Sequence, residues 1–239
     1  MSLLTICQSA ARMVPIAAPA AIIDNINETA QLLLSCAQAE GKALCRRHNW
    51  LSLVTEHTFS TVASQEDYDL PSDFKHLVNQ TLWDRDNFES IRGPLSPQQW
   101  QEYKSSVLAT TNTVWKRYRI RNVSGDVKFS IHPVPDSVET LVFEYVSGNW
   151  CESSGGAGRS EWQVDSDVGV VDEYLIELGI KWRLLNRLGM AYDEEREEYE
   201  NEVAKAIARD GSSQILNITG RNRYHLIGPG NVPDTGFGV

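Results

Sequence analysis

Histidine and cysteine are the residue types best suited to metal binding and nucleophilic chemistry, and neither is spaced for it here. No two of the five histidines form an H-x-x-x-H or H-E-x-x-H pattern, and no two of the four cysteines form a C-x-x-C pair. The cysteines are therefore predicted to be reduced, mostly buried thiols. We expect no metal and no cofactor; a site assembled from ligands distant in sequence is the alternative left open. The residues are His48, His57, His76, His132, His225, Cys7, Cys36, Cys45 and Cys151.

Two further stretches only partly match known reactive motifs. Residues 155–160 are rich in glycine but lack the G-x-x-x-x-G-K-[ST] spacing of a phosphate loop, so a flexible connector is predicted. Asp84 and Asp86 alternate like residues on the solvent-exposed face of a strand or turn, and we interpret both as solvated. There is no G-x-S-x-G elbow. We predict no catalytic residues and a protein that is not an enzyme.

The one basic run of the chain is residues 116–121. On a strand, Arg117, Arg119 and Arg121 share one face, while Tyr118 and Ile120 point to the other. The arginine face has three open interpretations: contact with nucleic-acid phosphate, pairing with acids of a neighbouring subunit, or plain solvent exposure. The first would make the chain a DNA-binding accessory module, which is the alternative function.

Overall charge argues against a general coat for nucleic acid. The 239 residues contain 32 acids and 22 bases, for a net charge of −10, and 41% are hydrophobic, which is ordinary for a globular protein. The most apolar stretch, residues 14–23, is short and broken by prolines, and residues 1–13 have no basic region before their apolar part. We therefore expect neither a membrane partner nor a secretory signal.

Hydrophobic periodicity divides the chain into two helical blocks around a β block. Residues 1–50 and 166–210 have apolar positions at helical spacing, whereas residues 51–165 carry Thr-, Val- and aromatic-rich runs typical of antiparallel hairpins. The predicted fold is α+β: an α-helical bundle formed by N- and C-terminal helices, with an inserted antiparallel β domain. Residues 211–239 form an extended C-terminal tail.

Local signals place individual elements. Ser2 is positioned to cap a first helix, a second is predicted over residues 25–48 with Gly41 as its weak point, and Ser96 opens a helix with a capping box. Strands are predicted over residues 58–62, 77–83, 117–121, 127–131 and 139–146, and helices along the stripes of residues 171–188 and 192–207.

The tail combines glycines with scattered apolar residues. It holds 6 of the chain's 16 glycines together with Pro229 and Pro233, which excludes a long helix. An irregular segment dotted with apolar residues usually needs a surface to lie on; docking on another chain is one interpretation, and packing on its own domain or fraying is the alternative. The residues predicted to dock are Ile215, Leu216, Ile218, Arg221, Arg223, Tyr224, Leu226, Ile227 and Phe237.

Several stretches together resemble one known family. They are the opening residues 3–7, Arg46 to Trp50, the Tyr68-Asp69-Leu70-Pro71-Ser72-Asp73-Phe74 element, Leu82 to Asp84, residues 92–97 with Trp100, Phe143 to Tyr145, Asp165 to Asp167, residues 178–183 and residues 209–211. In this order and spacing they resemble the head-to-tail adaptor, or connector, proteins of tailed bacteriophages, especially short-tailed ones.

The resemblance implies a structural role at the head–tail junction of the virion, with synthesis in the host cytoplasm. Its partners would be copies of itself in a ring of about twelve subunits, the portal protein, and tail nozzle or tail fibre proteins. Genomic DNA would pass through the channel without specific binding. The tail residues named above would bind the portal, and the subunit interface is expected to include Arg117, Arg119, Arg121, Trp182 and Tyr199.

Overall fold

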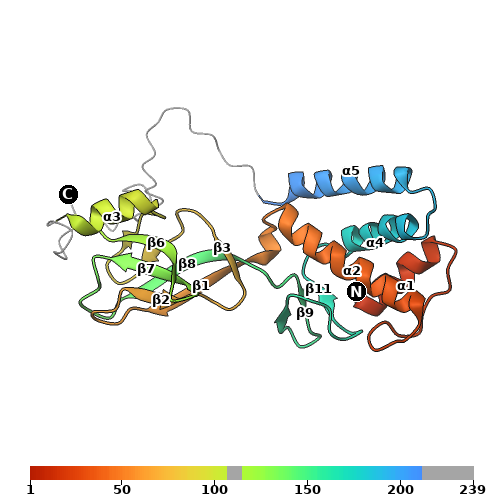
Figure 1. Cartoon of the computed structure of the whole chain (residues 1–239), viewed down its shortest axis with the longest axis horizontal. Coiled ribbons are helices and arrows are strands. Elements are labelled where there is room, and N and C mark those ends of the chain that lie inside the picture. The colour runs from red at the N-terminus through yellow and green to blue at the C-terminus, as the bar shows by residue number, and fades with distance from the viewer. Residues whose placement is uncertain (107–114, 212–239) are drawn as a thin grey trace, which may run out of the picture.

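The computed structural model describes residues 1–106 and 115–211, and these form two lobes along one long axis (Figure 1). Helices α1, α2, α4 and α5 make up the helical lobe, and two antiparallel sheets with helix α3 make up the β lobe. The predicted α+β fold is confirmed, with helices from both ends of the described chain in one bundle. The tail prediction falls on residues 212–239, which lie outside the described residues.

The helices of the helical lobe begin at the residues that the capping signals favour. The Ser2 hydroxyl accepts from the Thr5 N–H, and the Asn27 side chain does the same for Thr29. Three acids open the last helix, where they interact favourably with the helix dipole. The helices are α1 (Leu3–Met13), α2 (Glu28–Arg47), α4 (Glu173–Arg187) and α5 (Asp193–Arg209).

The core of the helical lobe includes a small sheet that follows the β lobe in sequence. Trp150 and Trp162 are buried against the helices, with their rings edge to face at a centroid distance of 5.1 Å. The small sheet that these tryptophans flank therefore shares the core of the helical lobe. The sheet consists of β9 (Cys151–Glu152), β10 (Gly158–Arg159) and β11 (Val168–Gly169).

Gly41 has a packing role that its helix propensity conceals. A Cβ atom at this position would lie 2.1 Å from Cζ3 of Trp150, so the indole ring occupies the space that any larger side chain would need. The interpretation of Gly41 as a weak point of α2 is therefore incomplete, because its lack of a side chain allows the bundle to close on Trp150.

The β lobe encloses a second, aromatic core between its sheets. Phe129 and Phe143 stack at 5.7 Å, and Tyr118 stacks on Phe129 at 5.2 Å. One sheet has the order β1-β8-β4-β5, with β3 also pairing β8, and the other has the order β2-β7-β6. The strands are β1 (Val54–Ser60), β2 (Asp67–Asp69), β3 (Phe74–Leu77), β4 (Trp83–Asp84), β5 (Glu89–Ser90), β6 (Arg117–Val123), β7 (Asp126–His132) and β8 (Thr140–Ser147).

The single strand predicted over residues 77–83 is wrong. Strand β3 ends at Leu77 and β4 begins at Trp83, with a turn between them in which Gln80 has φ = +65°. The Thr81 hydroxyl donates to the Val78 carbonyl across this turn at 2.7 Å. Side chain-to-backbone bonds of this kind compete with strand pairing, and they explain why an apolar run breaks here.

Helix α3 (Pro97–Ser105) begins as predicted. The Ser96 side chain accepts from the Gln99 N–H, and the Gln99 side chain accepts from the Ser96 N–H. Trp100 is 1% exposed, and Arg121 of β6 lies over its ring.

Within residues 1–106 and 115–211, the chain passes between the lobes twice. The first crossing follows α2 through a 3-10 turn (Leu51–Leu53) into β1, and the second leaves β8 for Trp150. At the second crossing, the Asp73 carboxylate accepts from the Tyr145 hydroxyl at 2.9 Å and from the Ser147 hydroxyl at 2.6 Å. No helix among residues 1–106 and 115–211 has the length and apolarity needed to cross a bilayer.

Candidate protein-binding surfaces

The arginine strand is built as the alternation predicts, but one of its arginines is already neutralised. Tyr118 is 1% exposed, and the three arginines lie on the opposite face of β6. The Arg121 guanidinium pairs with Asp67 at 2.9 Å, and its Nε donates to the Ser130 hydroxyl at 2.7 Å. Arg119 forms no ion pair with the residues that the structure describes. Because Arg121 is paired with Asp67, the arginine face offers less free positive charge than the sequence suggests.

Arg117 lies beside a shallow pocket between α3 and β6. The pocket has a volume of about 310 Å³ and is also lined by Tyr103. The Nη1 atom of Arg117 is buried, and no hydrogen-bond partner for it occurs among the described residues. This nitrogen of the Arg117 guanidinium is therefore turned away from solvent.

Tyr199 and Trp182, the two aromatic candidates for the subunit interface, differ in exposure. Tyr199 is 3% exposed, and its hydroxyl donates to Glu40, a fully buried carboxylate that also accepts from Nε of Arg183 at 2.7 Å. Burial raises the pKa of Tyr199, and it also raises the pKa of Glu40 despite these two donors. Trp182 is half-buried, with the Arg183 guanidinium 4.6 Å from its ring centroid. Only Trp182 presents appreciable surface to a neighbour.

The portal-binding residues predicted from the sequence, from Ile215 to Phe237, lie outside the described residues. The described chain ends at Gly211, beside the first crossing between the lobes. Here the Asp210 carboxylate accepts from the Leu51 N–H at 3.0 Å and pairs with Nε2 of His48 at 3.1 Å. Asp210, which directly precedes the predicted tail, is therefore held next to the segment that leads from α2 into the β lobe.

Asp84 was interpreted as solvated, and this is wrong, because it is 2% exposed. Its carboxylate accepts from the backbone N–H groups of Asp86 and Asn87, both at 3.0 Å, and from the Asn87 side chain at 2.9 Å. Asp86 is exposed, and its carboxylate accepts from the Thr140 N–H. The two acids together fold the turn between β4 and β5 and fasten it to β8.

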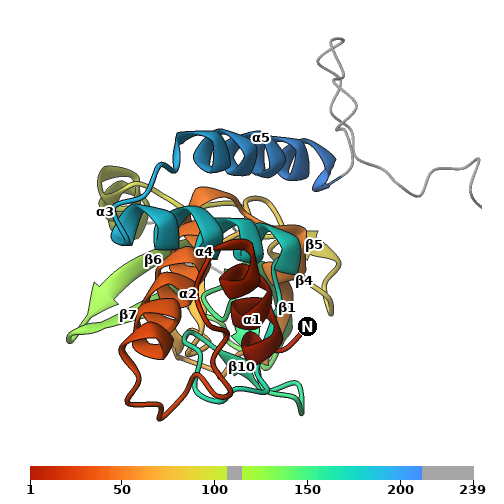
Figure 2. The same cartoon turned by 90° about the vertical axis from the view of Figure 1, so that its right-hand side faces the viewer.

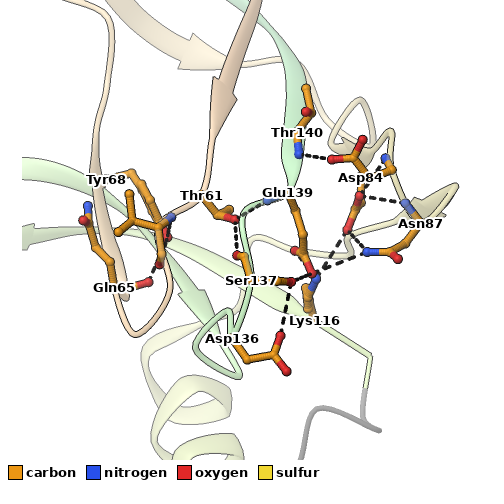
Figure 3. A network of polar contacts seen from close by, with 12 residues as sticks. Thr61, Gln65, Tyr68, Asp84, Asn87, Lys116, Asp136, Ser137, Glu139 and Thr140 are labelled. Atoms are coloured by element: carbon orange, nitrogen blue, oxygen red, sulfur yellow. Dashed lines mark hydrogen bonds and ion pairs between the residues drawn. The ribbon is translucent and has the colours of Figure 1, made fainter.

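A half-buried cation, Lys116, completes this network (Figure 3). The Lys116 ammonium pairs with Asp84 at 3.3 Å and with Glu139, a carboxylate that is 6% exposed. Burial alone would lower the pKa of Lys116, but its two acidic partners raise the pKa overall. The Thr61 hydroxyl accepts from the Glu139 N–H and donates to the Ser137 carbonyl, which extends the network to the end of β1. The β4–β5 hairpin is thus held by the Asp84 hydrogen bonds within its turn, by the bond from Thr140 of β8 to Asp86, and by the Lys116 ion pair.

Acidification is expected to weaken this hairpin. Burial raises the pKa of Asp84, but hydrogen bonds from Asn87 and the charge of Lys116 outweigh it, so the pKa lies below its ordinary value. A carboxylate with a lowered pKa contributes stability above its unfolded pKa and loses it as the pH falls through the folded value. We expect the free energy of unfolding, measured by urea titration, to fall below about pH 4. The Asp84→Asn variant should show a shallower fall; an equal fall would contradict the assignment.

The fastened hairpin forms one wall of a groove on the outer face of the larger sheet. We call this the Trp83 groove; it has a volume of about 540 Å³ and runs from Glu56 on β1, across Val142 on β8, to Trp83 and Phe88. Trp83 is 45% exposed and Phe88 is 85% exposed. Large aromatic side chains beside a groove are typical anchors for a protein partner.

Two of the residues that line the Trp83 groove have a strained backbone. Gln80 and Phe88 line it, and both have positive φ angles, +65° and +56°. Non-glycine residues pay a conformational cost in this region, which the surrounding structure must offset. The groove is therefore a built feature. Sequence reasoning missed Phe88, because an isolated phenylalanine between polar residues carries no periodic signal.

Several residues that carry the family resemblance hold turns. The Asp167 carboxylate accepts from the N–H groups of Gln163 and Val164 and pairs with Arg159 at 2.6 Å. The Asp165 carboxylate accepts from the Ile22 and Ile23 N–H groups, which ties the loop after α1 to the small sheet. These residues determine the fold of the helical lobe rather than a reactive site. Among the described residues, no group of three or more histidines, cysteines or acids is placed to hold a metal ion.

Comparison with known proteins agrees with this structural character. A family model described as SU10 adaptor protein matches residues 1–232. No curated protein matches the chain. Because the family match spans nearly all of the sequence, the chain belongs to the SU10 adaptor protein family and is a bacteriophage head-to-tail adaptor.

Proposed function

We propose that the protein forms a closed ring that docks under the portal, extends the DNA channel and provides the attachment platform for tail nozzle or tail fibre proteins. The observation that carries this proposal is the family match over residues 1–232. A ring of about twelve copies is a cyclic, heterologous assembly, in which one surface of each subunit meets a different surface of the next. The role is structural and non-enzymatic, with synthesis in the host cytoplasm.

The two-lobed shape supports the division of labour in this proposal. The helical lobe has an extensive buried core and few exposed aromatics, which suits a load-bearing wall of the ring. The β lobe projects from it and carries the Trp83 groove, which suits the attachment of tail proteins. We place the portal contact in the tail after Gly211 and the tail-protein contact on the β lobe.

The proposed subunit interface follows from exposure and charge. We propose that Arg119 and Trp182 contact the neighbouring subunit directly, because each has unpaired or exposed surface. Arg121 and Tyr199 are engaged within their own subunit, and one guanidinium nitrogen of Arg117 is buried, so we assign these three residues the role of positioning that surface.

We propose that genomic DNA passes through the channel without specific binding. A subunit with a net charge of −10 repels phosphate, and this repulsion favours sliding over adhesion. The alternative of a DNA-binding module depends on a free arginine face, and the pairing of Arg121 with Asp67 reduces that face. Duplex binding with a steep salt dependence would favour the alternative over the adaptor.

Deletion of residues 212–239 is expected to abolish tight portal binding. The tail supplies apolar side chains, such as Leu216, Tyr224 and Leu226, that bury surface when they order on a partner. Affinity for the isolated portal, measured by surface plasmon resonance, should fall at least about a hundredfold, which corresponds to about 2.7 kcal/mol. Mass measurement of the full chain alone and mixed with portal reports whether a ring forms. Unchanged affinity of the deletion variant would refute the proposal.

A further inference from the structure

We propose that, before assembly, the Trp83 groove is occupied by the C-terminal tail of the same chain, and that portal binding withdraws the tail and opens the groove. This inference rests on the proposed function, because it uses the portal as the competing partner. It adds a second docking site for the tail and an order to the assembly. The occupant is the apolar, arginine-containing part of residues 212–227.

The chemistry of the Trp83 groove selects an apolar and basic occupant. Its wall is formed by Trp83 and Phe88, which are left largely exposed in the described structure. Its rim carries the Glu56 and Glu144 carboxylates, and Glu144 forms no ion pair with the described part of the chain. Arg85 is the one base of the lining and is already paired with Glu56 at 2.9 Å. The groove is thus an apolar trough with a net acidic rim.

The tail has the composition that this groove requires. In a chain with a net charge of −10, residues 212–239 contain two arginines and a single acid. Both arginines, Arg221 and Arg223, stand close to Tyr224, Leu226 and Ile227. Arginine beside aromatic and aliphatic residues matches an acidic rim around exposed aromatic rings.

The anchoring of the tail brings it within reach of the groove. The Asp210 carboxylate accepts from the Leu51 N–H, and Glu56, which lines the groove, follows Leu51 by five residues, through a 3-10 turn (Leu51–Leu53) and the first residues of β1. Even fully extended, five residues span no more than roughly 17 Å, and a comparable length of extended tail covers that distance. In the view down the long axis, α5 ends on the side of the molecule where β4 and β5 lie (Figure 2). Tethering at this distance gives the tail a high effective concentration at the groove.

Pre-assembly occupancy has a consequence for the order of events. While the C-terminal tail of the adaptor covers Trp83 and Phe88, a nozzle or fibre protein of the phage tail has no access to them. Because the same apolar residues of the tail are those proposed to bind the portal, the two sites compete for them. Binding of the portal therefore exposes the groove, and tail proteins attach only to adaptors that have already docked on a head.

Photo-crosslinking in the full-length chain tests this inference. We would introduce Phe88→p-benzoylphenylalanine, irradiate the free protein and identify the linked peptide by mass spectrometry. Crosslinks to residues 212–227 are expected, and mixing isotopically light and heavy chains identifies whether they join one chain or two. The matched control is Val138→p-benzoylphenylalanine, since Val138 is 70% exposed in a different loop of the β lobe and should give no such link.

Each outcome decides the proposal. A link from position 88 to residues 212–227 within one chain supports it, and at least about a tenfold loss of that link in a Trp83→Ala background strengthens it. A link between light and heavy chains, a link elsewhere, or no link overturns it. Adding portal protein distinguishes failure of this inference from failure of the proposed function. If the portal binds but no crosslink to residues 212–227 forms beforehand, the inference alone is refuted. If the crosslink forms and the portal leaves it unchanged, the proposed role of the C-terminal tail in portal docking is refuted.

Discussion

Replacing Trp150 with alanine is expected to lower the free energy of unfolding by about 3–5 kcal/mol. The indole is 2% exposed, fills the space over Gly41 and meets Trp162 edge to face. It also lies where the chain returns from β8 to the helical lobe, so its loss leaves a cavity between α2 and the small sheet. Urea denaturation followed by circular dichroism measures the change.

The matched variant Gly41→Ala distinguishes packing from helix propensity. Propensity alone predicts stabilisation by up to about 1 kcal/mol, because alanine is the better helix former. The new Cβ atom would meet Trp150 at 2.1 Å, however, and overpacking of this kind costs about 1–3 kcal/mol. We expect net destabilisation. A stabilised Gly41→Ala variant would show that the indole moves aside freely, and it would contradict the role assigned to Trp150.

Replacing Asp84 with alanine is expected to cost about 3 kcal/mol and to loosen the β4–β5 hairpin. The replacement removes one of the two acidic partners of Lys116 and leaves Glu139 as the other, and it also frees the backbone N–H groups of Asp86 and Asn87 that Asp84 holds in the turn. Hydrogen exchange of residues 80–90 should accelerate, in addition to the loss of global stability. The same measurement reports whether the wall of the Trp83 groove depends on this carboxylate.

Asp86→Ala serves as the control for Asp84→Ala. Asp86 is exposed and accepts one hydrogen bond, from the Thr140 N–H, so its replacement should cost no more than about 1 kcal/mol. Equal effects of the two variants would mean that the buried network does not organise the hairpin.

Much of the fold could be predicted because its signals are local. The capping residues Ser2 and Ser96 act within one helical turn, and the alternation of residues 117–121 is a property of a single strand. The break between β3 and β4 could not be predicted, because it depends on a threonine hydroxyl bonding across a turn. The importance of Gly41 escaped for a related reason: its neighbour Trp150 is more than one hundred residues away in sequence.

The candidate surfaces show the same division. The alternation of the arginines is visible in the sequence, but Asp67, the acid that pairs with Arg121 at 2.9 Å, comes from another strand, β2. Asp84 and Asp86 look equivalent in the sequence, and only the tertiary position of Lys116 makes one of them a buried partner. Family resemblance predicted the role of the protein, whereas the Trp83 groove emerged only when β1, β8 and the hairpin were placed side by side.

The two crossings of the chain between the lobes determine how the molecule responds to torque. A single covalent link would let one lobe rotate about that link, whereas the segments after α2 and after β8 are separate connections that resist such rotation together. Two covalent connections restrict the relative rotation of the lobes more than one connection would, because a twist about one of them must also displace the other.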